Sequence, residues 1–110
     1  MAIVYLIGEI ENDNTYKIGV TRHNDVNKRK KELQTGCGQE LFIKDYFQTE
    51  YPFKLEKMLH NHFRNSKIHD EWFELTNEEI FSFKEICQKY QTIIESLKDN
   101  PYYFNKKEPF

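Results

Sequence analysis

Two short apolar segments, Val4-Tyr5-Leu6-Ile7-Gly8 and Tyr16-Lys17-Ile18-Gly19-Val20, decide the fold class of this chain. Each has the length and the alternation of a β-strand. The polar stretch between them, Glu11-Asn12-Asp13-Asn14, is typical of a tight turn, so the two strands are predicted to form an antiparallel hairpin. The first strand, residues 2–8, is apolar on both faces, which is typical of a central strand covered on both sides.

The segments that follow are predicted to form a third strand and three helices. Residues 40–48 are rich in β-formers. The helices are predicted from Asn24 or Asp25 to Thr35-Gly36, from Pro52 to about Arg64, and from about residue 77 to residue 98, with a capping box at Thr76 and Glu79. The expected fold is α/β, more narrowly α+β: a small three-stranded antiparallel sheet flanked by helices, with an added long C-terminal helix.

Size and composition narrow the class of protein. With 110 residues the chain is expected to form one compact unit, with a principal domain over residues 1–75 and a C-terminal helix and tail over residues 76–110. The formal net charge of -2 means that nucleic acid would have to bind a local basic patch, and Lys28-Arg29-Lys30-Lys31 is the dense one. Two cysteines and the absence of a signal peptide or membrane span favour a cytoplasmic or otherwise intracellular protein.

Four side chains far apart in sequence can be brought together by a hairpin packed on two helices: Tyr5, Lys17, Arg29 and Glu56. A tyrosine, a lysine, an arginine and a lone carboxylate are the groups needed to cut a phosphodiester with one divalent metal ion. A single carboxylate suits Mg²⁺, which keeps most of its waters. His60 lies four residues after Glu56 on the same helix face, but a third ligand for zinc is not apparent.

Each of these residues also has an ordinary structural explanation. Tyr5 fits a core tyrosine, Lys17 a solvent-facing lysine, and the Glu56–His60 pair an exposed helix surface. Arg29 lies between Val26 and Leu33 on the apolar stripe of its helix, where its stem could pack while its head reaches water. If Tyr5 and Lys17 share a face of the hairpin, however, the ammonium group can lower the pKa of the phenol and make it a plausible base.

Taken together, these residues resemble the GIY-YIG nuclease superfamily, and specifically its T5orf172 or meiotically up-regulated gene 113 branch. The resemblance covers roughly residues 3–75 in the expected order. The matching stretches are Val4-Tyr5-Leu6-Ile7-Gly8, Tyr16-Lys17-Ile18-Gly19-Val20-Thr21, Lys28-Arg29 through Leu33-Gln34-Thr35-Gly36, Leu55-Glu56-Lys57-Met58-Leu59-His60 and Glu71-Trp72-Phe73.

The resemblance implies a role for each of five residues. Tyr5 matches the tyrosine that acts as base or orienter of the attacking water, and Lys17 stands where the second motif usually has its tyrosine. Arg29 matches the helix arginine that binds the scissile phosphate, and Glu56 matches the carboxylate that holds the metal, Mg²⁺ or Mn²⁺. His23 matches a histidine that some members place after the second motif.

Other residues are expected to support this site. Lys28, Lys30 and Lys31, with Arg29, are expected to add attraction for DNA. Tyr16 and His60 are expected to lie around the catalytic groups. His60 and the Glu-Trp-Phe segment match the branch, without a firm role.

The sequence therefore predicts a metal-dependent endonuclease that hydrolyses DNA by a one-metal GIY-YIG-type mechanism, with no membrane partner. The alternative is a non-catalytic nucleic-acid-binding or protein-interaction module on the same fold, which the slight acidity of the chain and the aromatic tail, Tyr102-Tyr103-Phe104 and Phe110, favour. The distal half of the C-terminal helix and this tail are expected to contact a partner, most simply a second copy of the chain, and so to form a homodimer.

Overall fold

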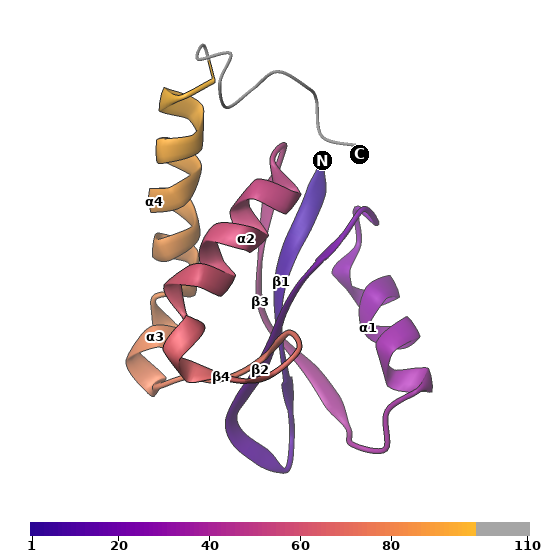
Figure 1. Ribbon diagram of the computed structural model, residues 1–110. Helices are drawn as coiled ribbons and strands as arrows, with labels where there is room; N and C mark the ends of the chain where they lie inside the picture. The colour runs from indigo at the N-terminus through magenta and orange to yellow at the C-terminus, as the bar shows by residue number, and fades with distance from the viewer. Residues whose placement is uncertain (99–110) are drawn as a thin grey trace.

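The structure, a computed structural model, describes residues 1–98. Its centre is an antiparallel sheet of five strands in the order β3-β1-β2-β5-β4. Helices cover both faces, with α1 on one side and α2, α3 and α4 on the other (Figure 1). The elements are β1 Ala2–Glu9, β2 Asn12–Thr21, α1 Val26–Thr35, β3 Leu41–Thr49, α2 Pro52–His62, a short 3₁₀ turn Arg64–Ser66, β4 Lys67–His69, β5 Trp72–Glu74, α3 Asn77–Phe81 and α4 Phe83–Ser96.

The central strand β1 is buried on both faces, as its apolar pattern predicted. Alternate residues Ile3, Tyr5 and Ile7 pack under α1 in one cluster with Val26 and Leu41. The intervening residues of β1 pack in a second cluster with the apolar stripes of α2 and α4. Since a strand alternates its side chains between two faces, this double burial fixes β1 in the middle of a three-layered molecule.

The predicted hairpin and the first two helices are confirmed. β1 and β2 pair antiparallel with Tyr5 opposite Gly19 and Ile7 opposite Lys17. Directly opposed residues point to the same face of a sheet, so Tyr5 and Lys17 share a face. Helix α1 begins after Asp25, whose side chain accepts a hydrogen bond from the backbone N–H of Asn27. Helix α2 begins at Pro52, where a missing N–H costs nothing.

The expected three-stranded sheet is wrong because two further strands extend it beyond β2. No strand was predicted after residue 48, but Trp72, Phe73 and Glu74 pair with Lys17, Tyr16 and Thr15 of β2. β4 then pairs antiparallel with β5. Each added strand has 3 residues, which is too short to show an alternating pattern.

The expected single helix over residues 77–98 is also wrong, because the chain forms two helices that meet at Ser82. The capping box at Thr76 and Glu79 opens α3 as predicted. The helix then breaks, and α4 starts at Phe83. Ile80 of α3 and Phe83 of α4 lie in the same core as Cys87 and Ile94. Ile94 in the distal half is therefore buried within this domain, whereas the neighbouring Ile93 is exposed.

The partner expected for the distal half of this helix remains a prediction. The aromatic tail to which it was also assigned lies outside the described residues. None of the helices in the described part of the chain has the length and apolar character that a bilayer crossing requires.

Candidate active site at the open edge of the second strand

The candidate site lies where β2 loses its outer neighbour. β5 pairs with β2 only as far as Lys17, so no strand in the described part of the chain covers the edge of β2 beyond it. The backbone of Ile18 instead makes two contacts with residues distant in sequence. Its N–H donates to the carbonyl of Glu71 at 3.0 Å. Its carbonyl accepts from Nε2 of His60 at 2.9 Å. Side chains from both faces of the sheet can therefore meet at this edge.

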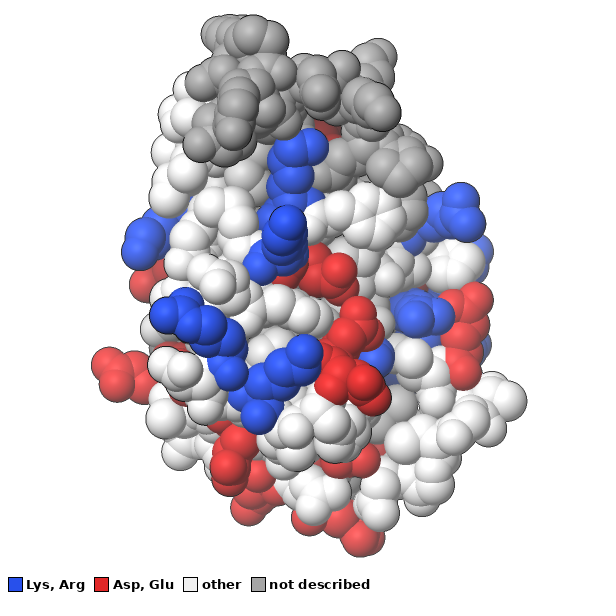
Figure 2. Space-filling view, viewed as in Figure 1, with Lys and Arg blue, Asp and Glu red and all other residues white. Residues whose placement is uncertain are grey.

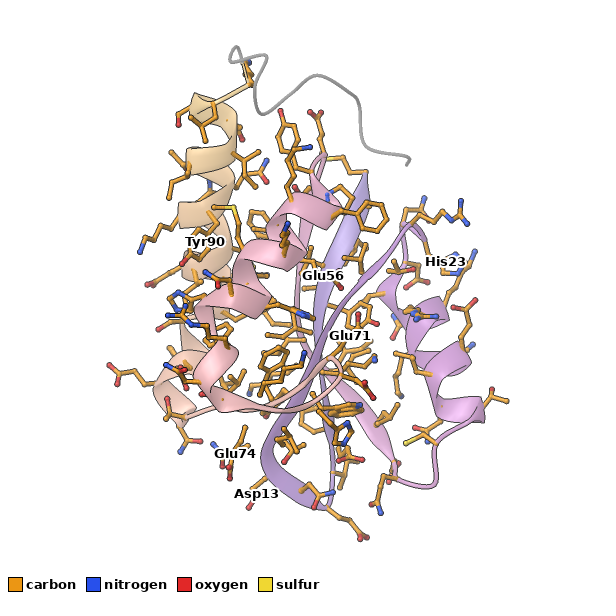
Figure 3. All side chains as sticks on the ribbon, in the orientation of Figure 1. Asp13, His23, Glu56, Glu71, Glu74 and Tyr90 are labelled. Atoms are coloured by element: carbon orange, nitrogen blue, oxygen red, sulfur yellow. The ribbon has the colours of Figure 1, made fainter. Side chains whose placement is uncertain are left out.

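Three potential metal ligands gather at this edge. Glu56, His60 and Glu71 each offer one ligand atom, and these atoms all lie within 4.8 Å of one another. Glu56 and His60 are one turn apart on α2, and Glu71 comes from the turn between β4 and β5. Figure 3 shows the labelled Glu56 and Glu71 near the centre of the molecule, between α2 and α1. All three side chains are partly buried.

Burial and mutual repulsion act on these carboxylates. Burial, followed by the charge and hydrogen bonding of Glu71, raises the pKa of Glu56 to about 7. Lys17 opposes this effect by lowering the pKa. The Nζ atom of Lys17 lies 2.8 Å from Oε2 of Glu71 and is largely shielded from solvent. Once Glu56 is ionised, the site holds two carboxylates and one ammonium group, an excess of negative charge that a bound cation would offset.

We expect the raised pKa of Glu56 to appear in the pH dependence of folding. Because the native state keeps this proton up to about pH 7 while a free carboxyl loses it near 4.5, the free energy of unfolding should fall as pH rises through that window. Above about pH 7, this loss in the free energy of unfolding no longer grows. Glu56→Gln mimics the protonated form, so this variant should gain stability relative to wild type as pH rises. Urea unfolding with chelator across pH 4–9 measures the difference.

The exposed Glu74 provides the matched control for this titration. The free energy of unfolding of Glu74→Gln should change with pH as that of the wild type does. A Glu56→Gln profile that also stays parallel to wild type would contradict the raised pKa.

Tyr5 and Arg29 form the second part of the site, on the face covered by α1. The Tyr5 hydroxyl and Arg29 Nε are the two buried side-chain polar atoms of the described residues that make no well-aligned hydrogen bond, although the phenol and the guanidinium lie close enough to interact. Burial raises the pKa of Tyr5, and the nearby Arg29 guanidinium only partly opposes this. Lys17, which was expected to lower the pKa of Tyr5, is engaged by Glu71 instead. Tyr5 is therefore a neutral phenol at neutral pH.

The glycine of the second motif makes room for the ring of Tyr5. Gly19 lies opposite Tyr5 in the β1–β2 ladder, and a Cβ at position 19 would come within 2.6 Å of Cζ of Tyr5. Real Cβ atoms do not approach so closely, and Tyr5 is fully buried and cannot swing into solvent. Gly19 is thus required by the close packing of the two strands.

Gly19→Ala should therefore destabilise the fold by about 1–3 kcal/mol, the usual cost of overpacking a core. Gly36 is the matched control because nothing lies within 4 Å of the position that a Cβ would take there, and its φ is -99°. Gly36→Ala should stabilise the protein slightly, by about 0.4–1 kcal/mol, through the unfolded chain. Chemical denaturation of the two variants measures the change in the free energy of unfolding for each. Equal changes in the two variants would contradict the packing argument.

Glu32 links the two basic residues of this face. It accepts from Nη1 of Arg29 at 3.3 Å, and its other oxygen lies 3.1 Å from Nε2 of His23. The hydrogen bonds from His23 and Arg29 lower the pKa of Glu32. His23 thus reaches the neighbourhood of Arg29 through Glu32. A hollow of about 440 Å³ includes all three among the described residues that line it.

Two other predicted residues have different placements. His60 belongs to the site, as described above, whereas Tyr16 lies on the opposite face of β2 from Lys17. Tyr16 packs edge-on against Phe42, with ring centroids 5.9 Å apart, in the core under α2 and α4. Tyr16 is therefore a core residue that the structure does not bring to the other site residues.

The basic residues of α1 do not dominate the surface. Lys28 and Lys31 are exposed, and Lys30 is partly buried. Figure 2 shows acidic and basic side chains side by side in the middle of the face seen in Figure 1, without a uniformly basic surface. Any electrostatic attraction for a polyanion would therefore be local.

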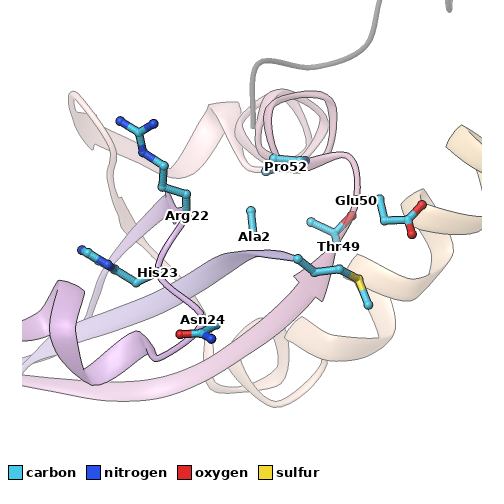
Figure 4. Close-up of a pocket in the computed structure, with 8 residues that line it drawn as sticks. Ala2, Arg22, His23, Asn24, Thr49, Glu50 and Pro52 are labelled. Carbon is cyan, nitrogen blue, oxygen red and sulfur yellow. The ribbon is translucent and has the colours of Figure 1, made fainter.

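A further pocket of about 660 Å³ lies away from the acidic cluster. Figure 4 shows it between the start of α2, the end of β3 and the loop before α1. Of the predicted site residues, His23 alone is among its described lining residues, which also include Ala2, Arg22, Asn24 and Thr49. The pocket thus borders the site through His23 and contains none of the three potential metal ligands.

Glu71 is the site residue that sequence reasoning missed as a functional group. It was noted only as the first residue of a Glu-Trp-Phe segment, and its position depends on strands β4 and β5, which were not predicted. The feature of the sequence that could have pointed to Glu71 is its position directly before an aromatic segment, Trp72-Phe73.

Comparison with known proteins identifies one family. The T5orf172 domain matches residues 2–88 of the chain. No curated protein and no solved structure gave a significant match.

Proposed function

This chain belongs to the T5orf172 domain family, a GIY-YIG-like family associated with nucleases, and from that premise we propose that it is a metal-dependent DNA endonuclease. We place it in the branch named after meiotically up-regulated gene 113, on the form of its Lys-Ile-Gly and Glu-Trp-Phe segments. The reaction is hydrolysis of a phosphodiester bond, in which the oxygen of water bonds to phosphorus and a P–O ester bond breaks.

One observation carries the proposal: two buried polar atoms, the Tyr5 hydroxyl and Arg29 Nε, make no well-aligned hydrogen bond, and the hydroxyl lies within electrostatic reach of two carboxylates. Buried polar atoms are almost always hydrogen-bonded, and exceptions call for an explanation such as a binding role. The phenol of Tyr5 and the guanidinium of Arg29 lie close enough to interact, and the charges of Glu56 and Glu71 act on Tyr5. A phosphodiester with its attacking water would satisfy both groups at once.

The donor set of the site fits a divalent cation. Glu56, His60 and Glu71 offer oxygen and nitrogen ligands within 4.8 Å of one another. Glu56 would hold Mg²⁺ or Mn²⁺ in the proposed mechanism. Such an ion, when bound, acts as a Lewis acid on the phosphate and stabilises the leaving oxygen.

The protein groups have distinct tasks in this reaction. Arg29 neutralises charge that builds on the phosphoryl oxygens. Tyr5, whose pKa is raised by burial, is better suited to orient the attacking water than to remove its proton. Lys17 holds Glu71 at 2.8 Å and offsets the repulsion between the two carboxylates. Glu32 and His23 fix the guanidinium of Arg29 from the solvent side.

Nicking of supercoiled plasmid tests the proposal. The purified chain should convert supercoiled plasmid to open circles with Mg²⁺ or Mn²⁺ and not with chelator. Since one site cuts one strand, open circles should precede linear product. Plasmid that is bound but never cut with any divalent metal would favour the alternative, a nucleic-acid-binding module. Absence of both cutting and binding would favour a protein-interaction module.

A further inference from the structure

The acidic cluster contains a histidine held in place by the backbone of the sheet. We propose that Glu56, His60 and Glu71 are joint ligands of one metal ion, and that His60 makes this centre prefer transition-metal ions such as Mn²⁺, Co²⁺ or Zn²⁺ over Mg²⁺. The inference deepens the proposed function, on which it rests for the metal's task, by naming the ligand set and the class of ion.

The three side chains converge from two separate elements. Glu56 and His60 are i and i+4 on α2, so they lie on the same face of one helix turn. Glu71 approaches from the β4–β5 turn and completes a group whose ligand atoms all lie within 4.8 Å of one another. Such a separation allows one ion at about 2.0–2.2 Å from each atom after small side-chain movements.

The orientation of His60 matches that of a metal-binding histidine. Its Nε2 lies 2.9 Å from the carbonyl oxygen of Ile18, and because a carbonyl only accepts, Nε2 carries the proton. In the neutral form of the ring the lone pair is then on Nδ1, which is the nitrogen that would bind the metal in this proposal. Metal-binding histidines typically donate their second ring N–H to a backbone carbonyl or a carboxylate, which fixes the ring and its tautomer. The ring also packs edge-on against Phe73, with centroids 5.0 Å apart.

The same residue of β2 positions the third ligand. The N–H of Ile18 donates to the carbonyl of Glu71 at 3.0 Å. The preceding residue, Lys17, holds Oε2 of Glu71 at 2.8 Å. Lys17 thus fixes the position of this carboxylate, and a metal ion would share Glu71 with its ammonium group. Two ligands from distant segments are therefore located by the backbone of one residue.

The identity of the ligands determines the metal preference. Imidazole binds Zn²⁺, Co²⁺ and related ions, whereas Mg²⁺ prefers oxygen ligands and keeps several waters. A site with Glu56 alone would be an oxygen site suited to Mg²⁺. Adding the nitrogen of His60 and the carboxylate of Glu71 gives a three-residue set, to which transition metals bind more tightly.

Direct metal binding tests the proposal without a cleavage assay. The full chain is titrated calorimetrically with Co²⁺ and with Mg²⁺, and the imidazole nitrogens are followed by NMR during addition of Zn²⁺. We expect the ring nitrogens of His60 to shift on addition of Zn²⁺, with smaller changes at the other histidines. His60→Ala and Glu71→Gln should each weaken Co²⁺ binding by at least about tenfold, a scale typical of losing part of a metal's ligand environment.

His62→Ala is the matched control, because His62 is also on α2 but bonds the Tyr90 hydroxyl at 2.7 Å, away from the cluster. It should bind Co²⁺ as the wild type does. His60→Ala should leave Mg²⁺ binding nearly unchanged, so its effect is on selectivity, which a merely structural role would not produce.

Two results would overturn the inference: unmoved His60 resonances at saturating Zn²⁺, or equal Co²⁺ affinity in wild type and His60→Ala. Co²⁺ bound through all three residues by a chain that never cuts DNA would support the inference and contradict the proposed nuclease. Cleavage that needs Mg²⁺ and is unaffected by His60→Ala, together with unchanged Co²⁺ affinity, would contradict the inference and leave the nuclease standing.

Discussion

Glu56→Gln is expected to abolish metal-dependent DNA cleavage while leaving the fold and most of the DNA affinity intact. The amide keeps the shape of the side chain but removes the negative charge that would hold the ion. It also removes a carboxylate that burial and Glu71 make costly to ionise, so the variant should be at least as stable as wild type above pH 7. Plasmid nicking, DNA binding and thermal unfolding of the same preparation measure the three properties.

The exposed Glu85, on α4, is the matched control for charge removal. Glu85→Gln should cut at the wild-type rate. A Glu56→Gln variant that also cuts at the wild-type rate would show that Glu56 is not the metal ligand. One that fails to cut because it is unfolded would be recognised by its thermal unfolding, and Glu56→Asp then provides a charged alternative.

Arg29→Ala is expected to lower turnover by ~10²–10³-fold, the usual scale for losing one preorganised donor to a transition state. Arg29 is partly buried, its Nε makes no well-aligned hydrogen bond, and Glu32 holds Nη1 at 3.3 Å. Lys30 is the matched control on the same helix. Lys30→Ala should weaken DNA binding modestly and reduce its salt dependence, with little effect on turnover.

Single-turnover cleavage at saturating protein separates these two effects. Arg29→Ala should lower the single-turnover rate. Lys30→Ala should mainly raise the protein concentration that is required to reach that rate. Small and equal effects from both would mean that Arg29 acts only as surface charge.

The parts of the fold that could be predicted are those with strong local patterns. The double burial of β1 follows from apolar residues on both faces of residues 2–8, and α1 follows from the cap at Asp25. β4 and β5 could not be predicted, because 3 residues show no periodicity and their stability comes from pairing with the distant β2. The break at Ser82 was missed because no Gly or Pro marks it and the apolar spacing continues from Ile80 to Phe83.

The candidate site shows the same division. The sequence left open whether Tyr5 and Lys17 share a face of the hairpin, and the register shows that they do. The sequence placed Tyr16 near the site, whereas the alternation of β2 directs Tyr16 into the opposite core. It could not show that Glu71 lies beside Glu56, since that proximity depends on the β4–β5 turn. It also could not show that Lys17 is engaged by Glu71 and so leaves Tyr5 to the influence of burial and Arg29.

Ile18 contributes to the site through its main chain alone, because its own side chain is buried in the core under α2 and α4. Its N–H meets Glu71 and its carbonyl meets His60, and both groups belong to every residue except proline. An alanine scan along β2 will therefore leave these two contacts in place, and any loss it reports at position 18 will reflect core packing. A slip of β2 by one residue would instead remove both contacts together and exchange its faces. The alignment of His60 and Glu71 is therefore controlled by strand register, and the two ligands are kept or lost as a pair.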